Sequence, residues 1–246
     1  MLPETTIVIA AYNEEKRLAQ SLKKIQDYRA ATELPVEIIV VDDGSTDNTA
    51  LLVVTLCLEV EGLNLISYRQ NRGKGYALRT GVLASRGKMV LLSDADFSTP
   101  IEELETLRLH LISQSHQIAI GSQALALSEI LRAQPLWRRG MSRVFNRIVR
   151  MLVLDGFQDT QCGFKLFTAE AARQLFGAAQ IDRFAYDVEI LALAQRNGFR
   201  VAEVPVRWTD CAGSKVRPVQ DSLQMLADLV KMRLAASCVK KTFHSA

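Results

Sequence analysis

The chain alternates short runs of β-branched residues with amphipathic segments, and this alternation limits the folds open to it more than any other feature. Runs with the composition of strands lie at residues 5–10, 36–41, 63–68 and 89–92. Segments that space their apolar residues as helices do lie between them, at about 18–25, 51–58 and 76–84. Strands that alternate with helices form mostly parallel sheets with helices on both faces, so the sequence predicts an α/β fold.

Composition excludes several other classes of protein. Apolar residues make up 48% and charged residues 23% of the 246 positions, which excludes a disordered chain, a collagen and a coiled coil. No uncharged apolar run approaches the roughly 18 residues of a membrane-spanning helix, and the first residues lack the pattern of a secretory signal. The four cysteines have no Cys-x-x-Cys spacing, so we expect reduced thiols in a cytoplasmic protein.

Charge is distributed unevenly along the chain. Residues 1–131 hold 12 Lys or Arg against 17 Asp or Glu, a net charge of −5, whereas residues 132–246 hold 18 against 10, a net charge of +8. A surplus of carboxylates followed by a surplus of cations is typical of a metal-assisted site beside a surface for anionic partners.

Acidic pairs follow two of the predicted strands directly. Asp94 and Asp96, at i and i+2, can turn toward one cavity, where Mg²⁺ or Mn²⁺ is the natural partner of two carboxylates. The alternative is a helix N-terminus, because Asp96 precedes Pro100 and an acidic turn. Asp42 and Asp43 can accept hydrogen bonds from a nucleobase or a ribose, or they can form a helix cap and a tight turn, as acidic pairs do in other folds.

A glycine-rich basic turn, Asn-Arg-Gly-Lys-Gly, covers residues 71–75. Its two glycines let the backbone approach a phosphate, and Lys74 supplies a positive charge. The spacing is that of neither a Walker loop nor a dinucleotide fingerprint, and a surface turn is the alternative. Because ligands of such sheets bind beyond the carboxyl ends of the strands, the three polar loops together suit a nucleoside diphosphate bridged by a divalent ion.

These motifs resemble those of family 2 glycosyltransferases of the GT-A fold, with matching patterns at residues 10–14, 41–47, 71–77 and 94–96. Further motifs resemble the polyprenyl-phosphate hexosyltransferase branch, most of all enzymes that glucosylate dolichyl phosphate, at residues 159–167, 184–189 and 208–215. The resemblance implies a GT-A, Rossmann-like α/β domain over residues 1–220. Residues 221–246 are then expected to form a C-terminal amphipathic helix and tail.

The resemblance implies metal-dependent, inverting transfer of glucose from UDP-glucose to a polyprenyl phosphate. Three alternatives remain: the same transfer with GDP-mannose or another UDP-hexose, transfer to a soluble acceptor, and a non-catalytic membrane-docking module on the same scaffold. Gln123 stands where the branch usually has an arginine, and nearby arginines could replace that cation.

The resemblance also implies roles for individual residues. Asp94 and Asp96 are expected to hold the metal. Contacts to the nucleotide sugar are expected from Ala10, Tyr12, Glu14, Asp42, Asp43, Lys74, Asp94 and Ala95. The candidate catalytic residues are Asp159, Asp94, Asp96 and Asp187. The candidate ligands of the acceptor phosphate are Arg138, Arg139 and Lys215.

Elementary chemistry refines two of these roles. A phosphate monoester is largely a dianion at neutral pH, so we expect Asp159 to orient the acceptor or a cation rather than to remove a proton. Asp187 and Glu189 lie on one side if they form a strand but diverge if they begin a helix. In the helical case only one of them can face the site, and we prefer Asp187.

A basic amphipathic stretch suggests which part of the chain would contact a membrane that holds a lipid acceptor. Residues 130–154 hold six arginines and no acid, and four of them, Arg139, Arg143, Arg147 and Arg150, recur at helical spacing. This pattern is typical of a helix on an anionic membrane, although a core-facing helix with a solvated basic side shares it. Residues 223–234 predict a second such helix or an ordinary C-terminal one.

We therefore expect a protein bound peripherally at the cytosolic face of a membrane. Its partners are expected to be a nucleotide sugar, a polyprenyl phosphate lipid and the membrane surface, with a recruiting membrane protein as a further candidate. No nucleic-acid motif accompanies the basic stretch, so nucleic acid is not an expected partner.

Overall fold

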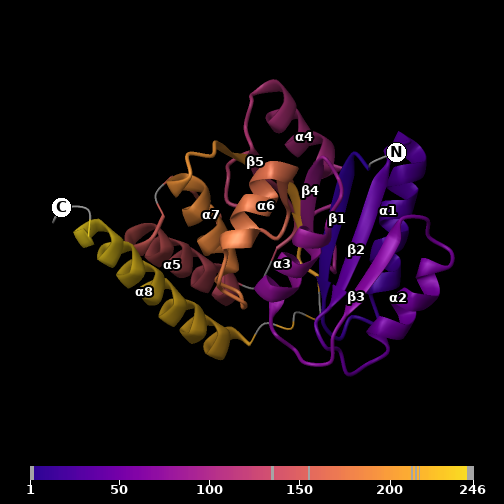
Figure 1. Ribbon diagram of the computed structural model, residues 1–246, viewed down its shortest axis with the longest axis horizontal. Coiled ribbons are helices and arrows are strands. Elements are labelled where there is room, and N and C mark those ends of the chain that lie inside the picture. Colours follow the sequence, from indigo (N-terminus) through magenta and orange to yellow (C-terminus); the bar gives the residue numbers. More distant parts are fainter. Residues whose placement is uncertain are drawn as a thin grey trace.

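A seven-stranded sheet forms the centre of the molecule in the computed structural model (Figure 1). The structure describes residues 3–133, 136–154, 156–211, 213, 215 and 217–242, with backbone alone at helix positions 136–139, 142, 143, 218, 219 and 235–242. The strand order is β3-β2-β1-β4-β7-β5-β8. The strands are β1 (Thr5–Ala11), β2 (Val36–Asp42), β3 (Leu63–Ser67), β4 (Met89–Asp94), β5 (Ile118–Ser122), β7 (Lys165–Thr168) and β8 (Val201–Pro205).

Helices cover both faces of the sheet because successive strand residues point to opposite sides. In β1, Ile7 and Ile9 pack with α1 (Leu18–Thr32), α2 (Thr49–Cys57) and α4 (Glu103–Ser113). Val8 packs on the other face, with α3 (Lys74–Ala84), α6 (Ala169–Ala178) and α7 (Tyr186–Arg196). The predicted α/β fold, with a mostly parallel sheet between two helical layers, is confirmed.

One strand of the sheet runs against the others. β7 is antiparallel to β4 and to β5, whereas every other neighbouring pair is parallel. A second, parallel pair, β6 (Glu129–Arg132) with β9 (Arg207–Thr209), lies outside the main sheet. These three strands have three or four residues each, too few for a periodic pattern in the sequence.

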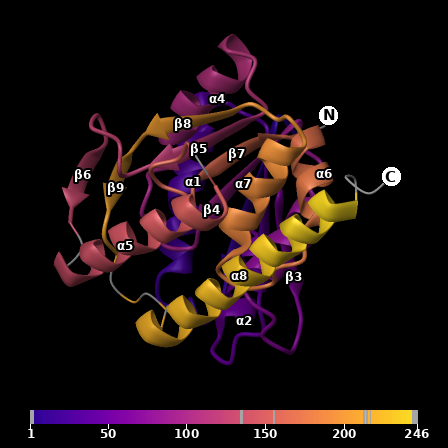
Figure 2. The ribbon, with the colours of Figure 1, turned by 90° about the vertical axis from the view of Figure 1, so that its left-hand side faces the viewer.

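Two long helices, α5 (Leu136–Leu152) and α8 (Pro218–Thr242), lie side by side on one flank of the molecule (Figure 2). In α5, Val149 is buried and Phe145 and Ile148 pack against the core, so part of its apolar side serves the fold, as the alternative interpretation held. In α8, Met225 and Leu229 are buried. Among the residues that the structure describes, no helix combines the length and apolar character that a membrane crossing requires.

Candidate functional site

The carboxyl ends of β1, β2 and β4 meet at one edge of the sheet and border a cavity of about 430 Å³. The structure brings most of the predicted site residues to its wall: Ala10, Tyr12, Glu14, Asp43, Lys74, Asp94, Ala95, Asp96 and Lys215. Asp42, Asp159 and Asp187 do not line it. The side chains of Arg138 and Arg139 lie outside the described residues.

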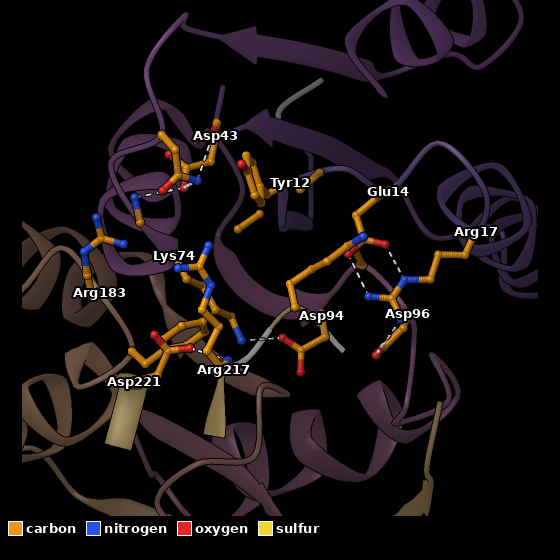
Figure 3. A pocket seen from close by; sticks show the side chains of 17 residues that line it. Tyr12, Glu14, Arg17, Asp43, Lys74, Asp94, Asp96, Arg183, Arg217 and Asp221 are labelled. Carbon is orange, nitrogen blue, oxygen red and sulfur yellow. Dashed lines mark hydrogen bonds and ion pairs between the residues drawn. The ribbon is translucent and has the colours of Figure 1, made fainter. Parts of the chain in front are cut away.

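Asp94, the last residue of β4, forms an ion pair with Lys74, the first residue of α3. The Lys74 Nζ atom lies 2.5 Å from Asp94 Oδ1 (Figure 3). Burial raises the pKa of Asp94, but the Lys74 ammonium outweighs burial and holds this pKa below its usual value. Burial lowers the pKa of Lys74, but Asp94 and other carboxylates outweigh it and raise that pKa above its usual value. Both groups are therefore charged at neutral pH.

Asp96 lies on the same wall and has both a local and a long-range partner. Its Oδ1 accepts hydrogen bonds from the Ser98 backbone N–H at 3.1 Å and the Ser98 hydroxyl at 2.9 Å, which closes a local turn. Asp96 does not cap a helix, as the alternative interpretation held, because α4 begins only at Glu103. The Asp96 Oδ2 atom lies 3.5 Å from Arg17 Nη1. Arg17 Nη2 lies 2.7 Å from Glu14 Oε1, which places this guanidinium between two acids of the cavity.

Gly163 fixes where the Asp94 carboxylate can lie. A Cβ atom at position 163 would lie 2.2 Å from Asp94 Oδ2 and 2.5 Å from Oδ1, well inside van der Waals contact. The carboxylate therefore rests directly on the glycine backbone, and this is the physical reason for a glycine in the segment that precedes β7.

Asp43 organises the glycine-rich turn. Its Oδ1 accepts the Arg72 backbone N–H at 2.8 Å, and its Oδ2 accepts the Gly73 N–H and the Asn71 side-chain amide, each at 2.8 Å. Gly73 has a φ of 111°, which favours glycine. Lys74 is thus presented to the cavity by a turn that hydrogen-bonds to the end of β2.

Asp42 has an internal role instead. Its Oδ2 accepts a hydrogen bond from the Ser67 hydroxyl at 2.9 Å, and its Oδ1 accepts the Ser45 backbone N–H at 3.2 Å. The Asp42 side chain is almost fully buried, and its hydrogen bond to Ser45 stabilises the loop after β2. Of the acidic pair, only Asp43 faces the cavity.

A second buried ion pair lies behind the cavity wall. Lys165 Nζ lies 2.6 Å from Asp187 Oδ1, and both side chains are buried. Burial raises the pKa of Asp187 above its usual value even though Lys165 opposes the shift. Asp187 belongs to the first turn of α7, so the helical alternative is correct, and Glu189 diverges to accept the backbone N–H groups of residues 180 and 181.

Asp159 is also buried and satisfied within the protein. Its Oδ2 accepts the Gln123 backbone N–H at 3.1 Å, and its Oδ1 accepts the Gln161 N–H at 3.0 Å. Glu203 in β8 in turn accepts the backbone N–H groups of Gln158 and Asp159. Asp159 thus holds the turn after β5 against the segment that leads to β7.

Three cavity residues were not predicted from the sequence: Arg17, Arg183 and Asp221. Arg183 and Phe184 come from the loop between α6 and α7, which an ion pair of 2.6 Å between Arg79 and Asp182 fixes to α3. The motif at residues 184–189 includes Phe184, but no local pattern marks Arg183 as part of the site, because the packing of α7 against α3 brings it there.

The carboxylates of Asp94 and Asp96, which form a D-x-D pair, fit a divalent cation. Within the described part of the chain, no cluster of three or more His, Cys, Asp or Glu side chains could form a complete metal cage. Mg²⁺ and Mn²⁺ do not need one, since they bind one or two carboxylates and take their other ligands from phosphate oxygens and water. Asp94 and Asp96 both line the cavity, where a diphosphate could supply those oxygens.

This sheet, with a D-x-D pair and a glycine-lysine turn at its carboxyl edge, defines a GT-A-type transferase. The family model for "Glycosyl transferase family 2" matches residues 6–176. The chain therefore belongs to glycosyl transferase family 2. The predicted family and enzyme class, a glycosyltransferase, are confirmed.

Individual relatives agree with this family. The chain is 39% identical over 239 residues to dolichyl-phosphate beta-glucosyltransferase of Dictyostelium discoideum, covering 93% of this chain and 73% of that protein. It is 37% identical over 243 residues to the Homo sapiens protein of the same name, covering 94% and 75%. A mannosyltransferase from Pyrobaculum calidifontis, solved with GDP-Man and Mn²⁺, shares the fold with a TM-score of 0.65 at 20% identity, over 94% of this chain and 65% of that one.

Proposed function

We propose that this chain transfers glucose from UDP-glucose to dolichyl phosphate or a related polyprenyl phosphate, with inversion and with Mg²⁺ or Mn²⁺ as cofactor. One observation carries the proposal: the D-x-D carboxylates, Lys74, Tyr12 and Asp43 line a single cavity in a chain whose relatives are named dolichyl-phosphate beta-glucosyltransferases. We also propose residues 1–220 as the catalytic domain and 221–246 as its C-terminal amphipathic segment.

The cavity accommodates the donor in two parts. Tyr12 and Asp43, at the ends of β1 and β2, are placed to contact the nucleoside, by stacking and by hydrogen bonding. Asp94 and Asp96, which line the same cavity, would lie beside the diphosphate and hold the divalent ion. When bound, that ion supplies electrostatic stabilisation of the departing diphosphate. Lys74 adds a positive charge on the same side.

The acceptor needs little activation. An oxygen of the lipid phosphate attacks the anomeric carbon from the face opposite UDP, and the bond from that carbon to the diphosphate breaks with its electrons passing to UDP. Because the phosphate is already largely a dianion, no strong base is required, and positioning dominates. Lys215 at the cavity, with Arg138 and Arg139, is proposed to bind this phosphate, while Asp159 and Asp187 act by positioning from behind the wall.

We propose that the flank made of α5 and α8 meets the membrane. The two helices present exposed apolar side chains at Met141, Val144, Met151, Leu223, Val230 and Leu234. Exposed basic residues accompany them, among them Arg147, Arg150 and Lys231. Apolar and basic side chains on one flank suit peripheral binding to an anionic bilayer at its cytosolic face, where the lipid phosphate would be met.

Donor screening with a lipid acceptor tests the function. Purified protein is incubated with dolichyl phosphate and, separately, labelled UDP-glucose, UDP-galactose, UDP-GlcNAc and GDP-mannose, and label is counted in the organic phase. We expect transfer from UDP-glucose alone, abolished by EDTA and restored by Mn²⁺ or Mg²⁺. Transfer from another donor, or undiminished transfer in EDTA, would contradict the proposed donor or the metal dependence respectively.

A further inference from the structure

One ion pair in the cavity joins the proposed metal ligand Asp94 to a lysine of the chain. Lys74 Nζ lies 2.5 Å from Asp94 Oδ1, and the two side chains keep 24% and 35% of their surface exposed to the cavity. The ammonium therefore already neutralises the carboxylate that the divalent ion would use. The carboxylate lies against Gly163, where a Cβ atom would come within 2.2 Å of Oδ2 and 2.5 Å of Oδ1, so only a glycine leaves room for it there.

We propose that the Lys74 ammonium occupies the cation's place at Asp94 until the donor binds, so that the divalent ion and the nucleotide diphosphate bind as a linked pair. This inference rests on the proposed function. Without nucleotide, a divalent ion that approached Asp94 would meet the Lys74 ammonium at the same oxygen, and like charges at such short range repel strongly. In the absence of nucleotide, the ion therefore binds weakly.

The diphosphate gives Lys74 another partner. Lys74 is the first residue of α3, and the N-terminal end of a helix carries partial positive charge, so an ammonium there needs an anion nearby. Without donor, Asp94 is that anion. A diphosphate in the same cavity offers a second one within reach of the flexible lysine side chain, and the ammonium can move to it and leave the carboxylate oxygen to the ion.

Asp96, the other proposed metal ligand, has a weaker contact with a cation of the chain. Arg17 lies 3.5 Å from Asp96 but 2.7 Å from Glu14, so its guanidinium is held mainly by Glu14. The dependence of ion binding on the nucleotide therefore comes from the ion pair between Asp94 and Lys74. Linkage between two ligands is reciprocal. If the nucleotide raises the affinity for the ion by some factor, the ion must raise the affinity for the nucleotide by the same factor.

Mn²⁺ binding to the full chain, measured from the electron paramagnetic resonance signal of free Mn²⁺ with and without UDP, tests this inference. In the wild type we expect weak binding of Mn²⁺ alone and roughly tenfold or greater tightening by UDP. Lys74→Met removes the charge while keeping side-chain length, so Mn²⁺ alone should bind roughly tenfold tighter than to the wild type, and UDP should tighten Mn²⁺ binding less than it does in the wild type. Lys74→Arg should restore the wild-type pattern.

A matched control is Lys88→Met, which removes a surface lysine paired with Glu4 at 3.1 Å and should leave both affinities unchanged. If Lys74→Met binds Mn²⁺ alone no tighter than the wild type, while the wild type binds Mn²⁺ with UDP, this inference is overturned and the proposed function stands. A wild type that binds no Mn²⁺ even with UDP contradicts the metal-dependent function itself.

If the Lys74→Met protein shows no cooperative unfolding transition, it is not folded and its Mn²⁺ affinity is uninformative. A structure of the wild type with Mn²⁺ and UDP then tests where Lys74 lies. Lys74 Nζ on a phosphate oxygen, with Asp94 on the ion, supports the inference. Lys74 Nζ still on Asp94, with the ion held elsewhere, overturns it.

Discussion

Gly163 is a site residue without a functional group, because it provides the space that the Asp94 carboxylate occupies. In Gly163→Ala the new methyl would overlap the carboxylate, so Asp94 must move. We expect a fall in kcat/KM of roughly 100-fold, since a displacement of about 1 Å in a site costs that much. The free energy of unfolding should fall by only about 1–3 kcal/mol, as for other overpacked positions.

The matched control for this substitution is Gly177→Ala in α6, where an added Cβ meets nothing within 4 Å. Alanine in a helix should leave activity unchanged and stabilise the fold by roughly 0.5–1 kcal/mol. Wild-type turnover in Gly163→Ala, measured in the donor assay with thermal unfolding alongside, would show that Asp94 is not held where the structure places it.

Single residues also show how far sequence reasoning reaches into the site. The loops after the strands were predicted correctly because the carboxyl ends of parallel strands must share an edge. Which acid of a pair lines the cavity was not predictable: Asp42 bonds to Ser67 away from it, while Asp43 lines it and holds the turn at residues 71–73. Arg183 belongs to the site only through a contact between helices distant in the sequence.

The buried ion pair between Lys165 and Asp187 joins β7 to α7 behind the cavity. Lys165→Met leaves Asp187 buried without its counter-charge, and breaking such a pair costs about 3–5 kcal/mol. We expect that loss in the free energy of unfolding, measured by urea denaturation at neutral pH. Replacing both members, as in Lys165→Met with Asp187→Leu, should recover most of it, because an apolar pair carries no uncompensated charge.

The loss in Lys165→Met should depend on pH in one direction. Burial already raises the pKa of Asp187, and without Lys165 this pKa rises further. A carboxyl whose pKa is higher in the folded than in the unfolded chain destabilises the fold in full above the folded pKa. The penalty shrinks as the pH falls through the folded pKa and is gone below the unfolded pKa. The deficit relative to the wild type should therefore shrink between neutral pH and about pH 5. A deficit that grows on acidification would contradict this assignment.

β7 shows why part of the fold escaped prediction. Its four residues begin with a lysine and lie in a segment without strand periodicity, so the sequence carried no signal for it. The strand forms because β4 and β5 leave a place between them and because Leu166 and Phe167 fill opposite faces of the core there. The longer strands β1, β2 and β4 were predicted to within about two residues, since their β-branched runs are specified locally.

Across the whole molecule, the acidic and basic halves of the sequence contribute to different surfaces. The acidic first half contributes most of the carboxylates of the cavity, and the basic second half contributes α5 and α8. In Figure 2, β6 and β9 lie beside α5, and Leu127 before β6 and Leu131 in β6 are exposed as well. The flank is thus broader than the two amphipathic helices predicted from the sequence.

Membrane binding through this flank is testable with one pair of substitutions. Val144 and Val230 are 61% and 49% exposed on α5 and α8, and Val144→Glu with Val230→Glu replaces apolar contact by negative charge. Co-sedimentation with anionic vesicles should weaken roughly tenfold or more, while transfer to a short-chain, water-soluble polyprenyl phosphate stays unchanged. Leu58→Glu is the matched control and should sediment like the wild type. Leu58 is 87% exposed and directly follows α2, which lies at the far side of the molecule in Figure 1. Equal sedimentation of all three proteins would mean that the membrane is met by another surface, and loss of the soluble-acceptor activity would mean that the substitutions act on the site rather than on the bilayer.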